Sequence, residues 1–362
     1  MEKGKISGIQ VTFLMVWTIV STGILYLPIT ISRHVTKDAW MIPITFLASI
    51  FIALISTNMG LKYPGQTVIQ YSQSLAGKIA GKGLGLILIF WFVTTSAIVV
   101  REFGEFIVVT MPSTPMIIMN TLIVLLACYA VKSGLEVMGR VSELLFPVVF
   151  FSITVVIVLV FGEVDLKRLL PMFDRGILPV IRGTMTPLSY GGEIITIMML
   201  IPFMNKPASA RKSAIFAVLI VASIGAQIET ITTAVFGESR ERMIFQHFHL
   251  IRMINVAQIF ERMDIVFVVT IFLGIFVKLA VLLYCSVLSM AQWLNLKTYK
   301  PLVLPTGVIV TAYSILFFEN INKLIEFLDD IFPPYALTVE VGIPSILLIL
   351  FYLKRYGGKK SA

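Results

Sequence analysis

Long apolar stretches separated by short polar ones cover almost the whole chain. Each stretch is close to or above the ~20 residues that an α-helix needs to cross the hydrocarbon core of a bilayer. We predict ten spanning segments, with approximate cores at residues 8–32, 40–61, 84–110, 115–131, 141–162, 184–203, 212–236, 264–293, 302–318 and 337–354. The pattern therefore predicts an all-α polytopic membrane protein, with residues 1–362 in a single integral membrane domain.

Composition supports the membrane class and argues against a soluble one. Hydrophobic residues make up 57% of the chain and charged residues 14%, with a mean hydropathy of +0.93. Soluble domains are about half apolar and about a quarter charged. The first apolar stretch is too long for a cleavable signal peptide and lacks a small-residue cleavage site, so we expect it to remain as a membrane helix. We expect membrane lipid to be a partner of the protein.

The net charge of +9 is better explained by membrane topology than by nucleic-acid binding, because no basic run is interleaved with aromatic residues. With the N-terminus inside, the inner loops hold more than half of the 29 Lys and Arg residues, and the outer loops more than half of the 20 acids. The positive-inside rule then places both termini in the cytoplasm.

The residue pattern does not indicate a metal site, a cofactor site or a catalytic site. Cys128 and Cys285 both lie in apolar segments and resemble small core residues. His247 and His249 are two residues apart, which on a helix points them to different faces. There is no phosphate loop and no zinc-protease motif. We expect no metal, no cofactor and no enzymatic activity.

Two apolar segments contain interruptions that a simple membrane helix would avoid. Residues Ser189–Pro202 read S-Y-G-G-E-I-I-T-I-M-M-L-I-P, and residues Ser21–Pro28 read S-T-G-I-L-Y-L-P. Paired glycines weaken a helix, and an ionised carboxylate at mid-membrane costs several kcal/mol. Two broken hydrophobic helices in corresponding places indicate a binding site in a transporter-like fold.

The two interruptions also indicate an internal repeat. The first segment runs from inside to outside and the sixth from outside to inside, so the interruptions lie at similar depth on antiparallel helices. This is the geometry of a five-plus-five inverted repeat. We expect repeats over approximately residues 7–162 and 183–318, with the tenth helix at approximately 337–354.

An unwound turn would free backbone groups that a bound ligand can satisfy. A half-helix restarting near Ile24 would present its positive end to a carboxylate, and one from Glu193 would stabilise that anion. The alternative is a kinked helix with a glycine packing contact. The predicted ligand-binding residues are Ser21, Thr22, Gly23, Ile24, Thr94, Ser96, Tyr190, Gly191, Gly192 and Glu193.

Further charges lie inside the predicted helices. Lys278 lies midway along the eighth segment, near the depth of Glu193, so the two are a candidate pair; the alternative is a lysine facing an aqueous cavity. Arg101 and Glu105 have i, i+4 spacing and can pair with each other. We regard these four residues as candidates for charge or proton coupling. Glu229 and Glu340 also lie in apolar segments, and Glu102 is expected to point elsewhere.

Two long outer loops contain amphipathic stretches, at residues 163–183 and 237–263. They can pack at the membrane interface, or they can form a lid over an outward vestibule. The sequence leaves both alternatives open.

An ordered set of short motifs carries a family resemblance along essentially the whole chain: Ile6–Gln10, Ser21–Pro28, Tyr63–Gly65, Gly77–Lys82, Tyr190–Glu193 with Pro202, and Phe260–Asp264. In these residues the chain resembles the B subunit of bacterial spore germinant receptors, the GerAB-type membrane proteins. These belong to the amino acid–polyamine–organocation superfamily. The resemblance implies a LeuT-like fold of ten helices, with helices 1 and 6 broken.

The resemblance also implies a function. Such proteins work in the inner membrane of dormant spores with a membrane A subunit and a lipoprotein C subunit. The B subunit is thought to bind a nutrient, commonly an amino acid, and to start germination. The glycines and acid of the family's sixth helix correspond to Gly191, Gly192 and Glu193, and its helix-one break to Ser21–Gly23.

Two other functions remain open at this point. One is a proton-coupled amino acid transporter of the same fold, in which Glu193, Glu105 or Lys278 takes part in coupling. The other is an ion or water pathway, or a scaffold for partner subunits, that binds no ligand. The sequence alone does not separate these three functions.

Overall fold

The computed structural model describes residues 2, 4–253 and 263–357, and within them the chain is built of helices. Phe260–Arg262, the first three residues of the motif Phe260–Asp264, lie outside the described residues. The α-helices are α1 (Gly8–His34), α2 (Ser49–Lys62), α3 (Val68–Ala76), α4 (Lys78–Thr110), α5 (Met116–Ser133), α6 (Leu135–Val160), α7 (Ile177–Gly183), α8 (Met185–Gly192), α9 (Ile197–Leu200), α10 (Ala210–Phe236), α11 (Gln246–Arg252), α12 (Met263–Trp293), α13 (Val303–Leu316), α14 (Ile321–Glu326), α15 (Phe332–Glu340) and α16 (Gly342–Gly357).

Shorter 3₁₀ segments join many of these helices, and one π-helical turn interrupts the last span. They are η1 (Lys37–Ala48), η2 (Phe161–Glu163), η3 (Leu166–Leu169), η4 (Glu193–Thr196), η5 (Ile201–Phe203), η6 (Pro207–Ser209), η7 (Gly237–Arg242), η8 (Lys300–Leu302) and the π-helical η9 (Phe327–Ile331).

Eight helical runs in the described part of the chain are long and apolar enough to cross a membrane: Gly8–His34, Lys37–Lys62, Lys78–Thr110, Met116–Ser133, Leu135–Glu163, Pro207–Arg242, Asp264–Trp293 and Ile321–Arg355. Two of the ten expected segments differ from simple spans. The ninth corresponds to the shorter apolar helix Lys300–Leu316. The sixth corresponds to a series of short helices from α8 to η5. The chain is therefore a multi-pass, all-α membrane protein.

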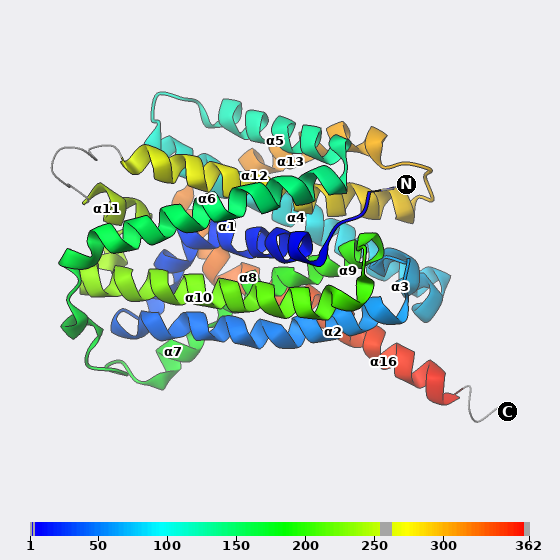
Figure 1. Ribbon diagram of the computed structural model, residues 1–362, viewed down its shortest axis with the longest axis horizontal. Coiled ribbons are helices and arrows are strands. Elements are labelled where there is room, and N and C mark those ends of the chain that lie inside the picture. The colour runs from blue at the N-terminus through cyan, green and yellow to red at the C-terminus, as the bar shows by residue number, and fades with distance from the viewer. Residues whose placement is uncertain (1, 3, 254–262, 358–362) are drawn as a thin grey trace.

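α1 is the central helix of the bundle. It runs between α6 and α12 on one side and α10 and α2 on the other (Figure 1), and it contacts α10, α12 and α6 directly. Nearly every residue from Val11 to Ser32 is buried. A helix that is apolar on all sides is stable where other helices surround it, which explains this position.

The expected break in the first segment is wrong, because α1 is a continuous α-helix through Ser21–Gly23. Ser21 Oγ donates to the carbonyl of Trp17 at 2.5 Å, the usual i−4 bond of a serine inside a helix. A Cβ on Gly23 would lie 3.8 Å from the ring of Tyr190. That separation is an ordinary van der Waals contact, so Gly23 faces the sixth segment from within a continuous helix and does not mark an unwound turn.

The sixth segment is irregular, as expected, but it is tightened and not unwound. α8 ends at Gly192, the next turn η4 is 3₁₀, and a short α9 and the 3₁₀ turn η5 follow. A Cβ on Gly191 would collide with Ser49, and one on Gly192 with Glu340. The two glycines therefore let α2 and α15 approach this segment closely, and the change of helix type occurs at that point.

The start of α1 and the end of the sixth segment are tied together. The amide of Ile6 donates to the carbonyl of Phe203 at 2.9 Å, and the amide of Asn205 donates to the carbonyl of Ile6 at 2.9 Å. The start of α1 and the end of α16 lie at the same end of the bundle (Figure 1). This arrangement agrees with the expectation that both termini lie on one side, whereas the identity of that side and the repeat boundaries stay predictions.

Candidate functional site

A buried ion pair lies where α1, η4 and α12 cross. Lys278 Nζ lies 2.9 Å and 2.8 Å from the two carboxylate oxygens of Glu193, and it donates to Thr22 Oγ1 at 3.0 Å. The side chains of Lys278 and Glu193 are 0% and 1% exposed. The expected pairing of these two residues is confirmed. Because charges inside a membrane protein are costly, such a pair marks a candidate functional site.

A second carboxyl group extends this cluster. The hydroxyl of Tyr190 donates to Glu102 Oε1 at 2.5 Å, and Lys278 Nζ lies 5.1 Å from the centre of the Tyr190 ring. Tyr26 donates to the backbone carbonyl of Glu102 at 2.9 Å. The sequence pattern did not predict a role for Glu102, because the i, i+4 spacing pairs Arg101 with Glu105 and gives Glu102 no partner on α4. Its position one residue after Arg101 places it on another face of α4.

A third carboxyl group approaches from α15. Glu340 is fully buried, and its carboxyl group lies where a side chain on Gly192 would otherwise be. We call Thr22, Glu102, Glu193, Lys278, Glu340 and Tyr190 the central polar cluster. It joins five parts of the chain that are far apart in sequence: α1, α4, the sixth segment, α12 and α15. Three acids in this cluster face one ammonium group.

Arg101 and Glu105 pair with each other on α4, as their spacing predicts. Arg101 Nη2 lies 2.7 Å and Nε 2.8 Å from Glu105 Oε1. Arg101 also donates to the backbone carbonyls of Ser314 and Ile315 at 3.2 Å each. The guanidinium group thus connects α4 to the end of α13. A role of this pair in proton coupling stays a prediction.

Thr94 and Ser96 bond mainly within α4. Thr94 Oγ1 lies 2.8 Å from the carbonyl of Phe90 and 2.8 Å from the hydroxyl of Tyr335, and Ser96 Oγ donates to the carbonyl of Phe92 at 2.7 Å. Neither residue lines the two cavities described below. Their part in a ligand site stays a prediction.

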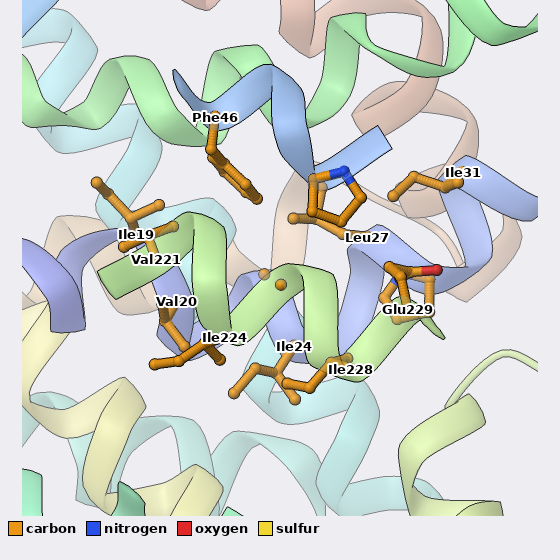
Figure 2. Close-up of a pocket in the computed structure, with 14 residues that line it drawn as sticks. Ile19, Val20, Ile24, Leu27, Ile31, Phe46, Val221, Ile224, Ile228 and Glu229 are labelled. Carbon is orange, nitrogen blue, oxygen red and sulfur yellow. The ribbon is translucent and has the colours of Figure 1, made fainter. Parts of the chain in front are cut away.

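An apolar cavity lies beside the cluster, on the other side of α1. It is a small space of about 30 Å³ between α1, η1 and α10, and Gly23 and Ile24 form part of its wall. Figure 2 shows Phe46 on one side of this cavity and Ile24 and Ile228 on the opposite side. Of the predicted ligand-binding residues, Gly23 and Ile24 line this cavity. Glu229 supplies the acidic group at one end, beside Leu27 and Ile31 (Figure 2).

A second buried ion pair closes the end of this cavity at Glu229. Arg240, fully buried in η7, pairs with Glu229 and with Thr233 of α10, and its Nε donates to Gln246 at 3.0 Å. Gln246 in turn donates to the carbonyl of Pro28 in α1 at 3.1 Å. This network ties the second outer loop to α1 and α10. The sequence analysis did not single out Arg240, because it lies in a loop rich in other charges.

A second cavity, of about 40 Å³, lies next to the first and shares Ile24 and Ile228 with it. α11 covers it with His247, whose Nε2 lies 3.3 Å from Thr232 Oγ1. α11 is buried against α12, α10 and α1, so this part of the second outer loop packs inward. Among the described residues, no group of three or more His, Cys, Asp or Glu side chains could hold a metal ion.

Comparison with known proteins identifies relatives along the full length. A family model described as "Spore germination protein" matches residues 5–323. Spore germination protein KB of Bacillus subtilis (strain 168) is 26% identical over 369 residues, covering 100% of this chain and 98% of that protein. Spore germination protein YndE of the same organism is 23% identical over 363 residues, covering 98% of each.

A solved structure shares the fold. The crystal structure of MhsT in complex with L-phenylalanine matches with a TM-score of 0.64 at 14% identity, covering 97% of this chain and 99% of that one. At this identity the likeness concerns the fold, which is LeuT-like.

Proposed function

The chain belongs to the spore germination protein family, and from that premise we propose that it is the nutrient-sensing membrane subunit of a germination receptor. It resides in the spore inner membrane, binds a small nutrient of the amino acid class, and passes the signal to a membrane A subunit and a lipoprotein C subunit. The observation that carries this proposal is the buried Lys278–Glu193 pair at the crossing of α1, η4 and α12. Intramembrane charges are expensive and are therefore a mark of function.

The surroundings of the pair support an amphipathic ligand. The first cavity, which must widen to admit a ligand, has apolar walls suited to a side chain. The Lys278–Glu193 and Arg240–Glu229 pairs each offer one cation and one anion. A zwitterionic amino acid carries the complementary groups. Ligand pockets that are mostly apolar with a few placed polar groups are the common kind. The MhsT structure, which contains L-phenylalanine, has the same overall fold.

Ligand binding requires a change from the arrangement described above. In the continuous α1, the amides of Gly23 and Ile24 belong to the helix, so a carboxylate reaches them only if α1 opens near Ser21–Gly23. We propose that the ligand favours this opened form, with its carboxylate near Gly23 and its amine near Glu193. The ligand thereby shifts the population between two conformations, and partner subunits respond to that shift.

The test uses spores of a deletion strain that express variants of this chain. A panel of amino acids is screened for germination, and binding of the active compound to the purified receptor is then measured with a radiolabel. We expect Glu193→Gln and Gly192→Ala to lower affinity at least tenfold at normal protein levels. The control Glu136→Gln breaks an exposed pair with Arg140 and should bind normally. Normal binding and germination by both site variants would disprove the proposed site.

A proton-coupled transporter is the second candidate, and the LeuT-like fold together with the buried Lys278–Glu193 pair favours it. Uptake of the active amino acid into proteoliposomes with an imposed proton gradient separates the two functions. Concentrative uptake that Lys278→Met abolishes would establish transport. Binding without uptake would support a receptor that does not transport.

A further inference from the structure

Glu340 differs from the other acids of the central polar cluster in what surrounds its carboxyl group. It ends α15 and is 0% exposed, and neither of its carboxyl oxygens has a hydrogen-bond partner in the described structure. Glu193 receives Lys278, and Glu102 receives the hydroxyl of Tyr190. An ionised carboxylate buried without any donor is far more costly than a neutral carboxyl group.

The charges of the cluster also favour a neutral carboxyl group on Glu340. Lys278 supplies one positive charge, which the carboxylate of Glu193 already neutralises at 2.8 Å. Ionised Glu340 would add a second or third negative charge beside that pair in a medium of low dielectric constant. A single proton on Glu340 removes this repulsion without moving any backbone. A metal ion is a poorer explanation, because no group of three or more candidate ligands occurs among the described residues.

The groups that surround Glu340 are known from the elements packed against α15. The charges that act on Glu340 are those of Glu193 in η4 and Lys278 in α12. The elements packed against α15 also carry Tyr190 in α8, Arg101, Glu102 and Glu105 in α4, Asp329 and Asp330 in η9, and Lys354 and Arg355 in α16, and α15 itself carries Tyr335. Asp329 is paired with Arg33 and His34, which removes it from the cluster. Lys278 is the cation whose charge reaches both Glu193 and Glu340.

Glu340 is also placed to affect the sixth segment. Its carboxyl group occupies the space beside Gly192, at the point where α8 changes to the 3₁₀ turn η4 that carries Glu193. A charge at this position would repel Glu193 and attract Lys278. The contact between α15 and the sixth segment therefore depends on whether Glu340 is neutral.

We propose that Glu340 is a proton-binding site, neutral in the conformation described here, and that binding of this proton holds α15 against the Gly192–Glu193 turn. Release of the proton weakens that contact and frees Glu340 to compete with Glu193 for Lys278. The proposal stands on the geometry of the cluster and does not depend on which nutrient is bound or whether one is bound.

The test is infrared spectroscopy of the purified full chain in lipid, titrated from about pH 7 to alkaline pH. A protonated carboxyl group has a C=O stretching band that a carboxylate lacks. We expect the wild type to show this band near neutral pH and to lose it on titration, with a fall in melting temperature. Glu340→Gln should lack the band and the accompanying fall. Glu193→Gln should lose the band at a lower pH than the wild type, because Lys278 is then free to pair with Glu340.

Glu340→Asp keeps the carboxyl group, so it should show the band at a shifted position, and it serves if the glutamine variant does not fold. Persistence of the unshifted band in both Glu340 variants would assign the proton to another acid and overturn the proposal. A wild-type band that appears only after Na⁺ and K⁺ are removed would make Glu340 a cation site, and it would equally overturn the proposal.

Discussion

A single buried side chain, Lys278, links several helices in the interior of this protein. Lys278 contacts Thr22 and Glu193, which belong to two other helical segments, so one ammonium group links three parts of the bundle. Removing water from such a pair is costly, and the attraction repays that cost only while both partners are present. Its energetic role is therefore best measured by removing one partner and then both.

Lys278→Met should lower the free energy of unfolding by about 3–5 kcal/mol, because it leaves the Glu193 carboxylate buried and unpaired. The double variant Lys278→Met with Glu193→Gln should recover most of that loss, because no unpaired charge remains. Thermal melting in detergent measures both. Lys323→Met, which breaks the exposed pair with Glu326, should change stability by less than about 1 kcal/mol. Equal losses in the single and double variants would contradict this account.

His247, in α11 between two spanning segments, predicts a pH effect. Burial, followed by the nearby Arg240 cation, lowers the pKa of His247 to about 3. The unfolded chain binds a proton here below about pH 6.5 and the folded chain does not, so stability falls as pH falls below that value, by up to about 1.4 kcal/mol per pH unit. His247→Asn should make the melting temperature depend less on pH between about pH 7 and about pH 5. An unchanged slope in the variant would refute this prediction.

At the scale of elements, the sixth segment is shaped by the helices that press on it. α2 and α15 both pack against α8, and the paired glycines let them do so. The tight 3₁₀ turn that follows aims Glu193 toward α12. α1 differs, because it stays continuous through Gly23, where an added Cβ would lie 3.8 Å from the ring of Tyr190.

Gly192→Ala should destabilise the protein by about 1–3 kcal/mol, because the new Cβ would overlap the carboxyl group of Glu340. Gly83, in α4, is the matched control, since a Cβ there meets nothing within 4 Å. Gly83→Ala should stabilise the protein by about 0.5–1 kcal/mol through helix propensity. Melting temperatures of the two variants, moving in opposite directions from the wild type, would support this explanation; a parallel shift would exclude it.

At the scale of the whole molecule, the helices form one bundle around α1, with the start of α1 and the end of α16 at the same end (Figure 1). The end that carries the start of α1 is held by backbone hydrogen bonds between Ile6 and the region of Phe203–Asn205. The opposite end is held by the Arg240 network. The central polar cluster lies between these two closures.

Cysteine labelling tests the orientation of the bundle. Lys206→Cys and Glu319→Cys place exposed thiols at opposite ends, and the natural Cys128 and Cys285 are buried, so background labelling should be low. A membrane-impermeant maleimide should label the Glu319→Cys variant in intact cells, and the Lys206→Cys variant only after permeabilisation. The reverse pattern would invert the topology derived from the loop charges.

The sequence by itself determined the membrane class and the approximate spans, and it predicted Lys278 and Glu193 as a candidate pair. Hydropathy, loop charge and the cost of a buried charge are properties that each segment carries locally. It also located the irregular sixth segment, since Gly191–Gly192 lowers helix propensity in any context. Only the tertiary structure decided that α1 continues through Ser21–Gly23, because neighbouring helices on all sides favour the continuous form. Only the tertiary structure brought Glu102 and Glu340 to the pair, because contacts between distant helices depend on their crossing geometry, which no local pattern encodes.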